Sequence, residues 1–224
     1  MKFSLVHPSR NRLERCEEAI KNWTKNFAYQ NDDTYEYILS CDISDSNIDE
    51  YRDLAKKYGA NITINDNTCC VDAVNEGGKV ANGDIIILVS DDFHCFYGWN
   101  IALKRYYIEN TPQLYQVWDG ITKDIITIPI MTKEAYKMLG YIYYPEYKSM
   151  FADNDLRLEA ERLEILVDAT LLHFPHLHWS NGLAQKDEQY EWQEKSENWK
   201  IGSALFEKRK EEMFRNLGLN KRFN

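Results

Sequence analysis

The chain has 224 residues, of which 36 are acidic and 27 are basic, so its formal net charge is −9. Apolar residues make up 44% of the chain and aromatic residues 13%, which is enough apolar material for a packed core and argues against a disordered protein. The acidic balance argues against a nonspecific DNA-binding protein, which needs a basic face, and no stretch of about 18 apolar residues predicts a membrane span.

The first residues predict a β-strand rather than a secretory leader, because His7, Pro8 and Arg10 interrupt the apolar run. The five cysteines are an odd number and form no C-x-x-C pair. This pattern favours reduced thiols over a disulfide framework. We therefore predict a cytoplasmic protein, and peripheral contact with a membrane is left open.

Strand and helix patterns alternate through the first 90 residues. Runs of β-branched and aromatic residues predict strands, and apolar residues at helical spacing predict the helices between them. The predicted strands span 3–7, 35–40, 61–64 and 84–90, and the predicted helices span 11–23, 47–58 and 71–81. This order predicts an α/β fold with a mainly parallel sheet and helices on both faces.

The second half of the chain is less regular. Helices are predicted at 98–109, 132–139 and 153–162, strands at 125–130 and 165–172, a loop with three histidines at 173–187 and a largely helical tail at 188–217. No internal repeat or low-complexity linker divides this half. We predict one domain over residues 1–190 and a C-terminal helical extension over 191–224 that packs on it.

A pair of carboxylates, Asp91 and Asp92, follows directly after the most hydrophobic predicted strand. In open parallel sheets, ligands bind at the carboxyl ends of the strands. Adjacent carboxylates repel each other and resist burial unless a cation compensates them, and Mg²⁺ or Mn²⁺ would do so together with phosphate oxygens. The alternative is that both residues form a turn or cap the next helix.

Three of the five histidines lie within residues 173–178. In an extended segment His176 and His178 point to the same side, which suits a shared ligand, and imidazole is a common metal ligand. The clustering favours a functional role over a solvated loop, but it does not decide which histidine binds.

Asp153 stands where the last long helix is predicted to begin. An aspartate at this place is a good helix N-cap. The same carboxylate is also a candidate general base, provided that it lies within hydrogen-bond reach of an acceptor hydroxyl. The sequence does not choose between these roles.

Several nucleotide-binding and hydrolase motifs are absent from the sequence. There is no G-x-G-x-x-G for a dinucleotide site and no G-x-x-x-x-G-K-[ST] for a P-loop. No G-x-S-x-G nucleophile elbow is present either. A Rossmann dehydrogenase, a P-loop NTPase and an α/β-hydrolase are therefore not expected.

The order of these segments resembles the GT-A glycosyltransferases, in particular the inverting family-2 type that uses nucleotide-diphosphate sugars. The resemblance extends from the first strand to about Tyr190. The segments that match are the loop Pro8-Ser9-Arg10-Asn11-Arg12, the acidic loop with Asp42, the segment around Asn75, the metal motif Ser90-Asp91-Asp92, the stretch Ala152-Asp153-Asn154-Asp155-Leu156, and the late histidines His176 and His178.

The resemblance implies a role for each matching residue. Pro8, Ser9, Arg10, Asp42, Asn75 and Asp91 would bind the nucleotide sugar, Asp92 with His178 and His176 would bind Mn²⁺ or Mg²⁺, and Asp153 would be the catalytic base. Two positions depart from the family pattern, because Ser90 replaces the first acid of the metal motif and Ala152 replaces the usual Glu. Asp45 competes with Asp42 for the role of facing the nucleobase.

The implied reaction is metal-dependent transfer of a sugar, with inversion, from a nucleotide-diphosphate sugar to an acceptor hydroxyl. The cation would offset the charge of the leaving nucleoside diphosphate, and UDP is the expected nucleotide. The acceptor would be a glycan, a lipid-linked molecule or another hydroxyl compound. Two alternatives stay open: a non-catalytic nucleotide-sugar binder, and a metal-dependent nucleotidyltransferase or phosphohydrolase.

Overall fold

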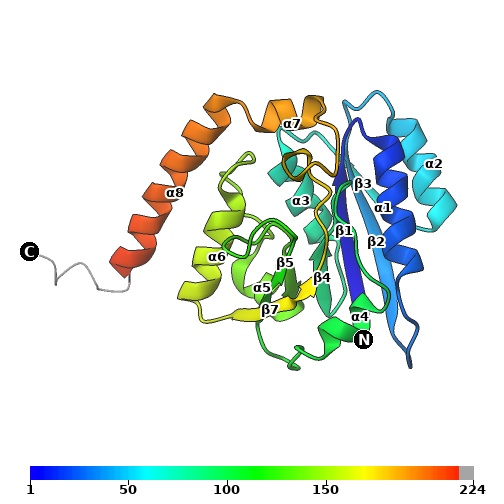
Figure 1. The fold of residues 1–224 in the computed structure, drawn as a ribbon, viewed down its shortest axis with the longest axis horizontal. Helices are drawn as coiled ribbons and strands as arrows, with labels where there is room; N and C mark the ends of the chain where they lie inside the picture. Colours follow the sequence, from blue (N-terminus) through cyan, green and yellow to red (C-terminus); the bar gives the residue numbers. More distant parts are fainter. Residues whose placement is uncertain (217–224) are drawn as a thin grey trace, which may run out of the picture.

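The computed structural model describes residues 1–216, with side chains up to Met213, and builds them around a seven-stranded sheet (Figure 1). The strand order is β3-β2-β1-β4-β6-β5-β7. The strands are β1 (Lys2–Ser9), β2 (Thr34–Asp42), β3 (Asn61–Asn65), β4 (Ile85–Leu88), β5 (Leu114–Trp118), β6 (Ile130–Thr132) and β7 (Leu166–His173). Within this sheet only β6 is antiparallel to its neighbours, so the prediction of an α/β fold with a mainly parallel sheet is confirmed.

Helices cover both faces of the sheet, as predicted (Figure 1). One face is covered by α1 (Leu13–Lys25), α2 (Ile48–Tyr58) and α4 (Trp99–Lys104), and the other by α3 (Cys70–Lys79), α5 (Lys133–Leu139) and α6 (Ala152–Arg162). Side chains of β4 alternate between the two apolar cores and are all buried. The unbroken Ile-Ile-Ile-Leu sequence of β4 follows from this double burial.

The carboxyl ends of β1, β2 and β4 meet at one edge of the sheet. In the parallel register Ser9 pairs with Cys41, and Val6 pairs with Leu88. The loops that leave these three strands are therefore neighbours, although the chain separates them by tens of residues. Ligands of open parallel sheets bind at such an edge.

The predicted strand at 125–130 is wrong. Only Ile130 of this run belongs to a strand, β6, while Ile126 and Ile128 are buried in irregular backbone. The β-branched residues that predict a strand here fill the core from irregular backbone instead. The strand that the prediction omitted is β5, where a buried glutamine, Gln116, interrupts the apolar run and is held by the carbonyl oxygen of Ile125 at 2.8 Å.

After β7 the chain returns to the carboxyl edge of the sheet, and a long helix then follows α6. A single 3₁₀ turn (Trp179–Asn181) leads to α7 (Glu188–Gln193), which lies above that edge, and α8 (Ser196–Asn216) then runs down beside α6 (Figure 1). Arg209 of α8 donates to the buried Asp155 of α6 at 2.7 Å. The last residues of the predicted extension, 217–224, lie outside the described residues. Within residues 1–216 no helix combines the length and the hydropathy needed to cross a bilayer.

Candidate active site

A cleft of about 790 Å³ opens at the carboxyl edge of the sheet. It is bounded by the loops after β1, β2, β4 and β5, by the first turn of α6, by the histidine loop and by α7. Among the residues that the sequence singled out for donor, metal or base, Asn75 and Asp45 do not line this cleft. The others do: Pro8, Ser9, Arg10, Asp42, Asp91, Asp92, Asp153, His176 and His178.

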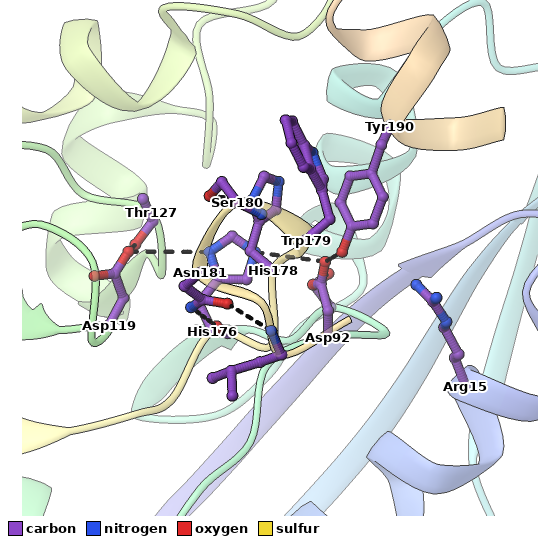
Figure 2. Close-up of polar contacts among 12 residues, drawn as sticks. Arg15, Asp92, Asp119, Thr127, His176, His178, Trp179, Ser180, Asn181 and Tyr190 are labelled. Atoms are coloured by element: carbon purple, nitrogen blue, oxygen red, sulfur yellow. Dashed lines mark hydrogen bonds and ion pairs between the residues drawn. The ribbon is translucent and has the colours of Figure 1, made fainter. Parts of the chain in front are cut away.

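Asp92 lies at the centre of the site, and only 5% of the residue's surface is exposed. Its Oδ2 accepts a hydrogen bond from the hydroxyl of Tyr190 at 2.5 Å and lies 3.4 Å from Nε2 of His176 (Figure 2). Ser90 donates its hydroxyl to the other oxygen. Burial alone would raise the pKa of Asp92, but the bonds and charge of His176, Ser90 and Tyr190 hold it well below its ordinary value, so this carboxylate is ionised.

His176 lies between two buried carboxylates. Its Nε2 faces Asp92, and its Nδ1 is 4.0 Å from Oδ2 of Asp119 (Figure 2). This Nδ1 is buried and has no hydrogen-bond partner in the structure. His178 is the next imidazole along the loop, with its ring centroid 4.9 Å from that of His176. Burial lowers the pKa of His178, which favours the neutral ring that acts as a metal ligand.

Asp91 differs from Asp92 because its Oδ1 is directed into the protein. This oxygen accepts bonds from Nε2 of His7 at 2.9 Å and from the hydroxyl of Ser9 at 2.8 Å. Because a carboxylate only accepts hydrogen bonds, Nε2 of His7 carries a proton, and Nδ1 of the same ring is hydrogen-bonded to the hydroxyl of Tyr37 at 2.8 Å.

The ligand atoms of His7, Cys16 and Asp91 lie within 4.8 Å of one another, a spacing that would allow a metal ion. Both ring nitrogens of His7 are already bonded, to Asp91 and to Tyr37. Burial raises the pKa of the Cys16 thiol well above its ordinary value, so this sulfur is not an available thiolate. The group is therefore satisfied as a buried hydrogen-bond network.

At the end of β2, Asp42 lines the cleft and Asp45 does not. Asp42 accepts from the backbone N–H groups of Ser44 at 2.7 Å and Asn67 at 3.0 Å, which joins the β2 and β3 loops. Asp45 accepts from the N–H groups of Asn11 and Asn47 and holds the neighbouring turns. Of the two competitors for the nucleobase, the structure thus gives Asp42 access to the cleft.

Asp153 lies in the first turn of α6 and is not its N-cap, so that the capping interpretation is wrong. The N-cap is Phe151, whose φ of 71° places it in the left-handed region, and its side chain makes no capping bond. Desolvation raises the pKa of Asp153 to about 6, with a smaller contribution from the charge of Asp119, whereas His176 acts in the opposite direction. A carboxylate with this pKa is suited to accept a proton near neutral pH.

Asn75 lies outside the cleft lining, and its amide holds the loop after α5. Oδ1 accepts from the N–H groups of Ile142 at 3.0 Å and Tyr143 at 3.1 Å, and Nδ2 donates to the carbonyl oxygen of Tyr143 at 2.7 Å. Both ends of the amide are therefore engaged with the backbone.

We expect the Asn75→Ala substitution to lower the free energy of unfolding by about 1–3 kcal/mol, because it leaves partly buried backbone groups of the 142–143 loop without partners. Urea denaturation measures this loss. The control is Asn82→Ala, which removes only a local, exposed bond to Val80 and should stay within about 0.5 kcal/mol of the parent. An Asn75→Ala protein of unchanged stability that no longer binds UDP would instead make Asn75 a donor contact.

Two site residues were missed by the sequence analysis, Asp119 and Tyr190. Asp119 follows β5 and accepts from the N–H groups of Ile121 and Thr122 and from the hydroxyl of Thr127, all at 2.7–2.8 Å. Recognition of β5 would have marked it, because it stands at the carboxyl end of a strand. No feature of the sequence around Tyr190 indicates a role in the site, because only the folded chain brings Tyr190 into contact with Asp92.

No family model matches the sequence, and no curated protein sequence matches it either. Solved structures do resemble the fold. S. aureus TarS 1–349 with UDP-GlcNAc aligns over 85% of this chain and 61% of its own at 13% identity and a TM-score of 0.64. The chain has the GT-A fold. The mannosyltransferase PcManGT from Pyrobaculum calidifontis, in complex with GDP-Man and Mn²⁺, is similar to this GT-A chain at 12% identity and a TM-score of 0.62. The alignment covers 85% of this chain and 59% of PcManGT.

A further GT-A structure is glucosyl-3-phosphoglycerate synthase from Mycobacterium tuberculosis, in complex with Mn²⁺, UDP and glucosyl-3-phosphoglycerate. It aligns over 85% of this chain and 74% of its own at 13% identity and a TM-score of 0.59. The chain spans less than two thirds of several of these relatives: it covers 36% of the longer TarS chain and 59% of PcManGT. The similarity establishes the GT-A fold of the region in common.

Proposed function

We propose that this protein is a metal-dependent, inverting glycosyltransferase that moves a sugar from a nucleoside-diphosphate sugar, UDP first among them, to an acceptor hydroxyl. One observation carries the proposal. The ionised carboxylate of Asp92, two imidazoles and the partly buried Asp153 open into one cleft at the carboxyl edge of a GT-A sheet. Each has the chemistry that such a transfer requires at that place.

The residues around Asp92 fit a divalent cation. Oxygen of Asp92 and nitrogen of His176 and His178 form a donor set that suits Mn²⁺, with Mg²⁺ as the oxygen-preferring alternative. Nδ1 of His176 is buried and has no hydrogen-bond partner. Because buried polar atoms are normally satisfied, this orphaned nitrogen supports a bound ligand at the site. When bound, the cation would neutralise charge on the diphosphate that leaves.

The other residues of the cleft have complementary tasks in this proposal. Asp153 accepts the proton of the acceptor hydroxyl as that oxygen attacks the anomeric carbon, and one such displacement inverts the configuration. Asp42 at the end of β2 faces the nucleobase. Arg10, which is exposed and donates to Ser44 at 3.1 Å, lines the cleft and supplies a forked donor for phosphate. Asp91, Pro8 and Ser9 form the wall for the remaining parts of the donor.

The ligands of the GT-A relatives support the donor class. TarS is complexed with UDP-GlcNAc and PcManGT with GDP-Man and Mn²⁺. The acceptor class is left to experiment, and a place in the cytoplasm or beside a membrane stays part of the proposal.

Incubation of the protein with UDP-, GDP- and dTDP-sugars, with Mn²⁺ or Mg²⁺ and with a set of glycan and polyol acceptors, tests the proposal. We expect release of the nucleoside diphosphate together with a product whose anomeric centre is inverted, detected by mass spectrometry and NMR. Pyrophosphate release would indicate nucleotidyl transfer instead. Donor binding without any turnover would indicate a binding protein, and the absence of donor binding with either metal would exclude the proposed function.

A further inference from the structure

The short helix α7 covers the Asp92 site. Its sequence Glu-Gln-Tyr-Glu-Trp-Gln is polar, yet Tyr190 in its middle is only 2% exposed. The side chain enters the cleft and ends at Asp92, where its hydroxyl donates to Oδ2 at 2.5 Å (Figure 2). The two residues are 98 positions apart in the chain, so this bond joins the C-terminal segment to the loop after β4.

Tyr190 is held in place from two sides. The guanidinium of Arg12, in the loop after β1, lies 4.4 Å from the centre of the Tyr190 ring, and the ring of His178 meets it edge-on at 4.7 Å. A cation over a tyrosine face and an edge-on aromatic pair both favour one ring position.

The start of α7 is fixed by the same arginine. Arg12 donates to both oxygens of Asp187, the N-cap residue of α7, through Nε at 2.9 Å and Nη2 at 2.6 Å. Asp187 also accepts from the N–H of Tyr190 at 3.1 Å. Bidentate pairs between arginine and carboxylate are among the stronger and more directional hydrogen bonds of proteins, so α7 has a defined position over the cleft.

We propose that Tyr190 is a positioning residue for the cation site, which orients the carboxylate of Asp92 towards His176 and His178. This inference rests on the proposed function only in assuming that Asp92 binds a divalent cation. One oxygen of Asp92 is bonded by Ser90 and the other by Tyr190, so the carboxylate is held at both oxygens. Oδ2 keeps a second lone pair on the side of His176, and removal of the phenol would free the carboxylate to rotate.

The proposal also assigns α7 to the site itself. Residues 191–193 and Lys195 line the cleft together with Tyr190, although the sequence placed them in an appended extension. Hydrogen-bond partners of metal ligands contribute about 10- to 100-fold to metal affinity in known sites. We therefore expect a measurable effect of the Tyr190 hydroxyl on cation binding alone.

The test is titration of the full chain with Mn²⁺, without nucleotide, followed by the electron paramagnetic resonance of free Mn²⁺. We expect Tyr190→Phe to weaken Mn²⁺ binding about tenfold while the variant stays folded, with its melting temperature lowered only by the loss of one buried hydrogen bond. The matched control is Tyr58→Phe. Tyr58 likewise donates to a carboxylate, Glu17, at 2.7 Å and lies beneath a cation, Lys57, but it does not line the cleft, so Mn²⁺ affinity should not change.

A second variant, Asp187→Asn, weakens the anchor of α7 without touching the phenol and should lower Mn²⁺ affinity in the same direction. Unchanged or tighter Mn²⁺ binding by Tyr190→Phe would overturn the proposal, because tighter binding would mean that Tyr190 blocks the site. A parent chain that binds no Mn²⁺ would overturn it too. A parallel titration with UDP present separates the two proposals: if Mn²⁺ binds but UDP does not, the proposed function fails and the role of Tyr190 stands on the Mn²⁺ data.

Discussion

The Asp153→Asn protein should bind the donor as the parent does and lose about 10²- to 10⁴-fold in kcat, the range that a general base contributes. The substitution keeps the shape of the side chain and removes its ability to accept a proton at neutral pH. Donor affinity is measured by calorimetry with UDP and Mn²⁺, and turnover by release of UDP. The matched control is Glu161→Gln on the same helix, whose carboxylate is exposed and pairs with Arg157 at 2.9 Å.

The pH dependence of the parent enzyme should report the same group. Because burial raises the pKa of Asp153 to about 6, the basic form is depleted below that pH, and kcat/KM should rise as pH increases through about 6 and level off above it. The Asp153→Asn protein should lack this rise.

The ionised form of Asp153 that favours activity above about pH 6 has the opposite effect on the stability of the fold. A carboxyl group whose pKa is higher in the folded than in the unfolded chain stabilises the fold only at low pH, and this contribution is lost as the pH rises towards about 6. At pH 8 the parent therefore carries a buried charge that Asn does not, and Asp153→Asn should melt at the same temperature or above it. A variant that retains most of its turnover would show that another group is the base.

The fold could be predicted from the sequence where hydrophobic period and burial agree. β1 to β4 could be predicted because their apolar runs are short and each is followed by a helical period. The predicted helix at 47–58 ends where α2 ends, before Gly59, whose φ of 64° favours glycine. β5 was missed because Gln116 within it and Gln113 just before it are buried with their own hydrogen bonds. Such polar residues are expected to be exposed when their hydrogen-bond partners are not known.

In the candidate site, too, some residues could be predicted from the sequence, whereas their contacts with other elements could not. Asp91 and Asp92 could be found because paired carboxylates after an apolar strand have no packing explanation, and His176 with His178 because of their spacing. The sequence could not show that Asp91 bonds inward to His7 while Asp92 faces the histidines, since alternation gives the side of a strand but not the partners across the sheet. The contact between Tyr190 and Asp92 depends wholly on where α7 is placed by Arg12.

The Asp92→Asn protein should lose nearly all cation binding and at least about 100-fold in kcat/KM, comparable with the removal of one electrostatic contact to the developing charge. The amide keeps the size of the side chain but not the negative charge that would bind the cation. Mn²⁺ titration and UDP calorimetry with and without Mn²⁺ measure the effect. In the parent, Mn²⁺ should strengthen UDP binding, and in Asp92→Asn the two affinities should become equal.

Asp91→Asn is the informative contrast, because the two residues are adjacent and both are buried. Oδ1 of Asp91 is occupied by His7 and Ser9, so the amide should cost stability, about 1–3 kcal/mol for a disrupted buried bond, and change Mn²⁺ affinity by only a few-fold. If the two variants lose Mn²⁺ equally, the pair acts as one ligand, and the division of labour between an inward and an outward carboxylate does not hold. If only Asp92→Asn loses it, the cation site belongs to the side of the cleft formed by Asp92, His176 and Tyr190.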